Sequence, residues 1–197
     1  MTAEEDVGSR PRGRDEVVAA LVSAAARLFA DRGPAAVSLR EVAREANVNV
    51  GLIHRHIGGK DDLLAAVLRA RPGTAAIDQL VGSPLEEFVP MLLQTNFGEA
   101  LFSRLQARTI LDGFDIQGLQ RSFPVYEYAV EQLCDRVPEA DAVARGALLA
   151  VAVIGWAVFG PTMLQIAGAA DRPIEEVVAA MRPAIDAFLA APPSGAV

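Results

Sequence analysis

The sequence predicts an all-α protein. Hydrophobic residues account for 52% of the 197 residues and aromatic residues for only 6%, and alanine is abundant throughout, which is typical of a compact helical fold. Hydrophobic residues recur three and four positions apart, whereas no segment shows the strict alternation that indicates a β-strand. Capping residues, glycines and prolines delimit these segments, so we expect about nine helices.

The N-terminal third contains four helical segments in close succession. Asp15 is expected to cap the first segment, and Gly33 and Pro34 end it. Ser38 and Glu41 have the spacing of a capping box for the second. An Asn-Val-Asn turn follows, and its last residue caps the third. We expect these helices at residues 15–32, 39–46, 50–57 and 60–71.

Longer helical segments follow in the C-terminal two thirds. Residues 83–86 have the sequence of another capping box, with proline in the first turn, and Pro90 is expected to kink the helix that follows. Residues 146–170 carry no charge, which indicates a helix that is buried in its subunit or covered by a partner. We expect helices from residue 83, at 99–111, at 119–136, from about 141 and at 174–191.

Charge is unevenly distributed along the chain. The net charge is −7, yet residues 7–60 hold nine Lys or Arg against five Asp or Glu, whereas residues 72–197 hold seven against fifteen. Because phosphate binding requires a basic surface, contact with nucleic acid is expected in the N-terminal third. The single cysteine, Cys134, cannot form an intrachain disulfide, and residues 1–8 lack the apolar core of a signal peptide, so we expect a cytoplasmic protein.

Three short helices with a tight turn before the third form a helix-turn-helix, which places its third helix in the major groove of DNA. The sequence here reads SLREVA at 38–43, ANVNVGLI at 46–53 and KDDLL at 60–64. In these residues, and over about 15–70, the chain resembles the tetracycline-repressor (TetR) family of regulators. The resemblance implies a homodimeric repressor that an apolar effector releases from a palindromic double-stranded operator. An activator, or a regulator without an effector, is the alternative.

The outer side of the third helix is expected to contact DNA. Val48, Ile53 and Ile57 are spaced to pack this helix onto the first two. Leu52 can contact a thymine methyl group, and Arg55 can pair with guanine or with a phosphate. The complete set of expected DNA contacts is Arg12, Arg14, Ser38, Arg40, Asn49, Val50, Gly51, Leu52, His54, Arg55, His56 and Lys60.

Some of these contacts depart from the family or lie outside the helix-turn-helix. The family usually has tyrosines where His54 and His56 stand and a small hydroxylated residue at Leu52, so we expect the histidines to donate to the DNA backbone. Lys60 follows two glycines at a helix N-terminus, which favours a phosphate. The arginines of residues 10–14 either enter a minor groove or form a solubilising tail.

The resemblance also implies a helical effector-binding and dimerisation region. We expect the last two long helices to form the dimer interface and an apolar pocket to lie between about 83 and 162. The expected pocket residues are Phe97, Phe102, Gln106, Phe114, Tyr126, Trp156, Phe159 and Met163. The expected interface residues are Val151, Val158, Val178, Met181, Ile185 and Phe188.

The predicted organisation is a flexible basic arm at 1–14, a DNA-binding domain at 15–60, a connecting helix at 61–72, an effector and dimerisation domain at 73–191 and a tail at 192–197. We expect no cofactor, metal site or catalysis. His54 and His56 are two positions apart on a helix and point away from each other, and neither has a glutamate three residues before it, as a carboxylate-bridged metal enzyme requires. A membrane sensor that spans the bilayer with residues 146–170 is the remaining alternative.

Overall fold

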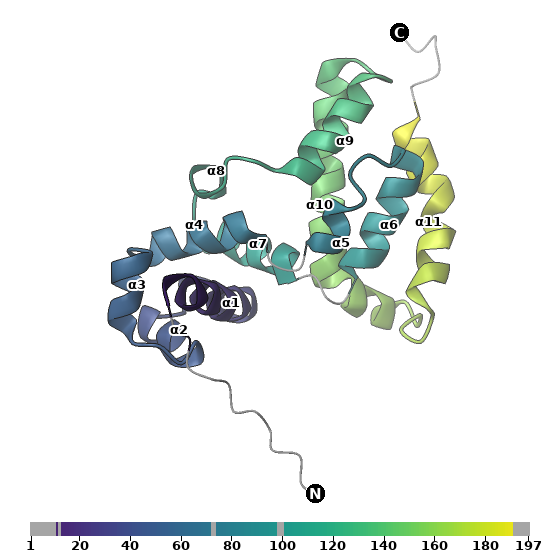
Figure 1. Ribbon diagram of the computed structural model, residues 1–197. Helices are drawn as coiled ribbons and strands as arrows, with labels where there is room; N and C mark the ends of the chain where they lie inside the picture. The colour runs from purple at the N-terminus through teal and green to yellow at the C-terminus, as the bar shows by residue number, and fades with distance from the viewer. Residues whose placement is uncertain (1–10, 12, 72–73, 98–100, 191–197) are drawn as a thin grey trace, which may run out of the picture. The chain divides into compact units, whose positions relative to one another are not determined.

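The computed structural model describes residues 11, 13–71, 74–97 and 101–190, which form eleven α-helices and no strand (Figure 1). The predicted all-α class is therefore confirmed, and two four-residue helices, α5 and α8, raise the number above the expected nine. The helices are α1 Arg14–Arg32, α2 Leu39–Glu45, α3 Val50–His56, α4 Lys60–Ala70, α5 Ala75–Asp78, α6 Leu85–Asn96, α7 Leu101–Leu111, α8 Ile116–Leu119, α9 Pro124–Cys134, α10 Glu139–Ile166 and α11 Ile174–Leu189.

The chain divides into two compact units. The first contains Met1–Pro72 and also Arg108–Gln120, and the second contains Gly73–Ala107 and Arg121–Val197. The last residues of α7 and the whole of α8 therefore belong with the N-terminal helices, and α8 contacts α4.

In the first unit, α1 supplies the centre of the core. Its buried side chains, which include Leu21 and Phe29, follow the helical spacing of the sequence, and α1 contacts α2, α3 and α4. The aliphatic face of α4 closes this core with Leu63, Leu64 and Leu68, all fully buried. Three short helices are therefore held in place by packing rather than by their own helical stability.

The turn between α2 and α3 depends on Asn47. This residue has a φ of 53°, in the left-handed region that asparagine tolerates better than other residues with a β-carbon. The backbone N–H of Val48 then donates to the carbonyl oxygen of Ala43 at 2.9 Å and ends α2. The chain thereby reverses within a few residues, so that α2 and α3 pack against each other.

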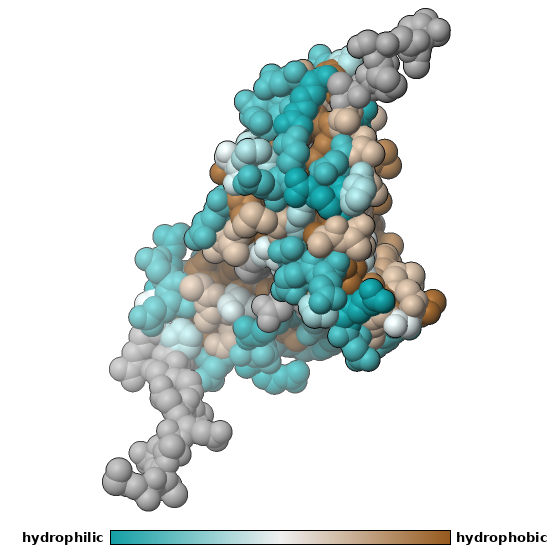
Figure 2. Space-filling model, turned by 90° about the vertical axis from the view of Figure 1, so that its right-hand side faces the viewer, coloured by the Kyte–Doolittle hydropathy of each residue, from teal (hydrophilic) through white to brown (hydrophobic). Residues whose placement is uncertain are grey.

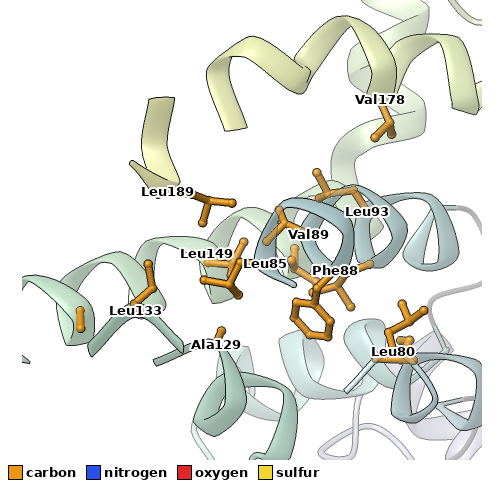
Figure 3. Close-up of a cluster of buried hydrophobic side chains, with 14 of the residues drawn as sticks. Leu80, Leu85, Phe88, Val89, Leu93, Ala129, Leu133, Leu149, Val178 and Leu189 are labelled. Atoms are coloured by element: carbon orange, nitrogen blue, oxygen red, sulfur yellow. The ribbon is translucent and has the colours of Figure 1, made fainter. Parts of the chain in front are cut away.

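In the second unit, α6 packs against both α10 and α11, and α9 packs against α10 (Figure 1). Gly146 allows the close approach of α9, because a β-carbon there would lie 2.4 Å from Cγ2 of Val130. A cluster of buried side chains, most of them from these four helices, forms the core (Figure 3). It includes Leu85, Phe88, Val89, Leu93, Ala129, Leu133, Leu149, Val178 and Leu189.

Several polar contacts fix the helix ends of this unit. The Arg136 guanidinium forms a two-point ion pair with the Glu86 carboxylate, which lowers the pKa of Glu86. Nη1 of Arg145 donates to the carbonyl oxygens of Phe188 at 2.6 Å and Ala190 at 2.5 Å, and so joins the end of α11 to α10. The free carbonyls at a helix C-terminus need such donors.

Three predicted helix starts were wrong. Gly13 is the N-cap residue of α1, so Asp15 lies in its first turn, where it still favours the helix dipole. The N-cap residue of α6 is Pro84 and no side chain caps this helix, so the capping box expected from Ser83 does not form. Instead the Ser83 carbonyl accepts a hydrogen bond from the hydroxyl of Tyr128. Helix α9 begins at Pro124, not near residue 119, because proline suits a first helical position.

Candidate nucleic-acid interface

The second and third helices begin at side-chain caps, as the sequence predicted. The Ser38 hydroxyl accepts the backbone N–H of Glu41 at 3.2 Å, and the Glu41 carboxylate accepts the backbone N–H of Ser38 at 2.8 Å. Asn49 caps α3 by accepting the backbone N–H of Gly51 at 2.8 Å. Both helices therefore have fixed first residues, and the outward side of α3 starts at a defined position.

Glu41 is held in its ionised form by three hydrogen-bond donors. Besides the backbone N–H of Ser38, its carboxylate accepts the Ser38 hydroxyl and Nη1 of Arg32, each at 2.8 Å. These contacts, the backbone N–H of Ser38 first, lower the pKa of Glu41 to about 2. The hydroxyl proton of Ser38 is thus engaged inside the protein.

Replacing Glu41 with glutamine is expected to flatten the acid dependence of stability. The lowered pKa means that the ionised carboxylate stabilises the fold above pH 4.5 and that this contribution is lost as the pH falls through about 2. Glutamine can still complete the capping box but carries no charge. We expect the unfolding midpoints of wild type and Glu41→Gln, followed by circular dichroism, to converge between these two pH values. A constant difference across this range would contradict the assignment.

The outward side of α2 and α3 carries cations that have no acidic partner. Arg40 and Arg55 are exposed, and in the part of the chain that the structure describes neither side chain forms an ion pair or a hydrogen bond. Arg44, one turn after Arg40, is also exposed, and its side chain has no partner among the described residues. It was not among the expected DNA contacts, although its spacing of four residues from Arg40 puts both on one side of a helix. By contrast, Arg27 and Arg32 pair with Glu45 and Glu41.

The remaining expected DNA contacts lie in different surroundings. Gly51 and His54 of α3 are exposed, whereas Val50, Leu52 and His56 are half-buried. Arg14 is exposed at the start of α1, and Asn49 is exposed although its side chain caps α3. Nζ of Lys60 donates to the carbonyl oxygen of Ala35 at 3.1 Å, which leaves its other donors available. Arg12 and residues 1–10 of the predicted arm lie outside the described residues.

The structure brings together only part of the expected pocket. The rings of Phe97 and Trp156 lie 5.2 Å apart, and Nε1 of Trp156 donates to the carbonyl oxygen of Leu93 at 3.2 Å. Tyr126 packs beside Gly146, at the contact between α9 and α10. Phe102 and Gln106 are half-buried on α7, and Phe114 belongs to the first unit.

Phe159 and Met163, also expected in the pocket, are exposed on α10. A buried polar pair was missed by the sequence analysis: the Ser103 hydroxyl donates to the Asn96 side-chain oxygen at 3.1 Å. Neither residue differs in type from an ordinary surface residue, so only the fold reveals their burial.

The expected interface residues separate into two groups. Val178 is buried in the core of its own chain, and Ile185 and Phe188 pack against that core. Val158 and Met181 are half-buried, whereas Val151 is 69% exposed. Of the six, Val151 alone presents most of its side chain to the surroundings.

Helix α10 carries an exposed apolar stripe, which we define as Leu148, Val151, Phe159, Met163 and Ile166. Most of these residues follow a buried residue by two positions, such as Leu149 before Val151, and therefore point about 200° away from it. Gly155 lies within the stripe, and a β-carbon there would meet no atom within 4 Å. Figure 2 shows hydrophobic residues gathered along the right-hand side of one face of the molecule.

Helix α10 also has the length and composition of a membrane span. Among the described helices it alone meets that description, with a mean hydropathy of 2.0 over an 18-residue window of which 22% is buried. Membrane contact and contact with a second protein surface both provide apolar cover for such a helix.

Sequence comparison finds relatives over most of the chain. The sequence profile described as "Bacterial regulatory proteins, tetR family" matches residues 21–67. The HTH-type transcriptional repressor Rv3405c of Mycobacterium tuberculosis is 38% identical over 163 residues, which are 80% of this chain and 81% of that protein. The HTH-type transcriptional regulator BetI of Brucella suis is 30% identical over 159 residues, 72% of this chain and 77% of BetI.

Solved structures with the same fold include two bacterial regulators. The transcriptional regulator SCO4942 of Streptomyces coelicolor superposes with a TM-score of 0.65 at 21% identity, over 86% of this chain and 96% of that one. A TetR-family regulator from Mesorhizobium loti gives a TM-score of 0.61 at 15% identity, over 90% and 97% of the two chains. At these identities the likeness shows the shared fold.

Proposed function

This chain belongs to the tetR family of bacterial regulatory proteins, and we propose that it is a homodimeric repressor that an apolar small molecule releases from a palindromic operator. As a member of the family it is a transcriptional regulator that binds DNA through its helix-turn-helix. The name of Rv3405c, a transcriptional repressor, supports repression. We place its action in the cytoplasm, where the operator is accessible.

The exposed, unpaired cations of α2 and α3 carry the proposal of operator contact. Arg40 and Arg55 have no internal acidic partner among the described residues, so binding a phosphate or a base costs them no existing ion pair. Arg55 lies on α3, which the helix-turn-helix geometry places in the major groove. There a guanidinium can donate two hydrogen bonds to guanine.

The exposed stripe of α10 supports a homodimer. Apolar side chains of this size at one continuous surface are rarely left in water. Residues 146–170 carry no charge, so a second copy can approach the stripe without burying an unpaired ion. Dimerisation also supplies the second recognition helix that a palindromic operator requires.

The aromatic contact between Phe97 and Trp156 supports an apolar effector in the second unit. Both side chains are half-buried, and Gly160 lies against both rings, where a β-carbon would be 3.2 Å from Phe97. Planar apolar molecules favour such aromatic surroundings. The nearby Asn96 and Ser103 pair offers polar groups that can orient a bound molecule.

Operator contact is tested by selecting bound duplexes from random DNA with the wild-type chain. We expect a palindromic site, which Arg55→Ala binds about tenfold or more weakly, because one base or phosphate contact is lost. Arg69→Ala is the matched control: Arg69 is an exposed arginine of α4 in the same unit, and its loss changes the net charge equally. Equal affinities of the two variants would contradict the site.

Effector and mode of regulation need separate measurements. We expect the low-molecular-mass fraction of a cell extract to release the operator from the wild-type chain and to release it less well from Trp156→Phe, which loses the indole N–H that holds the ring on the carbonyl oxygen of Leu93. We also expect the chain to lower expression of a reporter placed behind the selected operator. Raised expression would indicate an activator, and an extract without effect would indicate regulation without an effector.

A further inference from the structure

The turn between α1 and α2 is held by three side chains from three parts of the chain. The backbone N–H of Ala35 donates to Oδ2 of Asp112 at 2.7 Å, and its carbonyl oxygen accepts Nζ of Lys60 at 3.1 Å. Nη2 of Arg32 donates to the carbonyl oxygen of Ala36 at 3.2 Å. Arg32 and Lys60 lie in the N-terminal helices, whereas Asp112 is 77 residues away from Ala35 in sequence.

The Asp112 carboxylate fits closely over the backbone that it contacts. Gly33 has a φ of +84°, and a β-carbon there would lie 2.6 Å from Oδ2 of Asp112. Glycine is therefore required at this position for two reasons: the backbone conformation and the close approach of the Asp112 carboxylate. Asp112 itself is fixed at the end of α7, where its backbone N–H donates to the carbonyl oxygen of Arg108 at 2.9 Å.

The turn between α1 and α2 leads directly into the helix-turn-helix. Val37 is buried, and Ser38 is the N-cap residue of α2, which packs against α3. A displacement of Ala35 therefore changes the entry of α2, and with it the direction in which α3 presents Arg55. Small displacements of this kind weaken contacts that depend on geometry much more than contacts that depend on charge alone.

We infer that Asp112 is a positioning residue for operator recognition, and that the DNA-binding unit extends to residues 108–120. The matched family profile ends at residue 67, so this part of the unit lies outside it. The inference rests on the proposed operator contact of α3. Asp112 itself touches no DNA, and it acts by fixing the peptide of Ala35.

The test compares Asp112→Ala with Asp115→Ala on the selected operator and on an unrelated duplex. Asp115 lies three residues further on and caps α8 by accepting the backbone N–H of Gln117 at 3.1 Å, so each variant loses one negative charge and one hydrogen bond from a backbone N–H. Removing a negative charge by itself strengthens DNA binding. We expect Asp112→Ala nevertheless to bind the operator about threefold to tenfold more weakly than Asp115→Ala, with unrelated DNA bound equally.

A loss of folding would weaken binding to both duplexes together. The ratio of the affinity for the operator to the affinity for the unrelated duplex therefore separates positioning from stability. Asp112→Asn keeps a side-chain oxygen that can accept the N–H of Ala35, and we expect it to restore the ratio. Hydrogen exchange of the Ala35 amide should be faster in Asp112→Ala than in the other variants. Equal operator affinity of the alanine variants, or unchanged Ala35 exchange, overturns the inference. Failure of the wild-type chain to bind any duplex overturns the proposed function instead, and the exchange measurement still tests the contact.

Discussion

Val151→Glu is expected to convert the protein into a monomer and to lower operator affinity by about 100-fold. Val151 lies on the exposed stripe of α10 and is 69% exposed in one subunit. In a two-fold dimer each substitution occurs twice at the same interface, so two unpaired carboxylates would be buried. The separate subunits would each bind one half-site, without the gain that comes from linking two binding events. Sedimentation and operator titration measure the two effects.

Val143→Glu is the matched control for this prediction. Val143 is an exposed valine on the same helix, but it lies outside the stripe and faces a different direction. We expect this variant to remain a dimer with wild-type operator affinity. Dissociation of both variants would point to a general effect of charge on α10, and dissociation of neither would remove the stripe from the interface. Recovery of the wild-type chain in a membrane fraction would support the membrane sensor instead.

The limits of α2 and α3 could be predicted because they depend on neighbouring residues. Ser38 with Glu41, and Asn49 with Gly51, are close in sequence, so their hydrogen bonds follow from local geometry. Ser83 has the same local signal, but the N-cap residue of its helix is Pro84, one residue later, and the Ser83 carbonyl oxygen accepts a hydrogen bond from the hydroxyl of Tyr128. The local signal therefore did not decide where α6 begins.

The side of α10 that faces the core could not be predicted. Helix α10 is apolar on more than one side, so periodicity does not distinguish Leu149, which is buried, from Phe159, which is exposed. Helix α11 has one apolar side, and its periodicity does not tell whether that side packs in its own chain, as Val178 does, or against a partner. The contact of Asp112 with Ala35 was invisible for a different reason. It joins residues 77 positions apart, and an aspartate near a glycine is the ordinary composition of a turn.

Ile53→Ala is expected to weaken operator binding strongly while leaving the second unit folded. Of the seven residues of α3, all of which the structure describes, Ile53 alone is fully buried, with 0% of its surface exposed. Truncation to alanine leaves a cavity under the recognition helix and costs about 2–5 kcal/mol, and Ile53→Val about 0.5–1.5 kcal/mol. Denaturant unfolding and operator titration should therefore rank wild type, valine and alanine in the same order.

Leu52→Ala distinguishes this loss of packing from the loss of a DNA contact on the same helix. Leu52 is half-buried and belongs to the expected DNA-contacting side. We expect Leu52→Ala to unfold near the wild-type denaturant concentration but to select a different base at one operator position, because a contact with a thymine methyl group is lost. Ile53→Ala should show the reverse: lower stability and weaker binding to every duplex, without a changed base preference. Normal operator binding by Ile53→Ala would contradict the role of this buried side chain in fixing α3 on the first two helices.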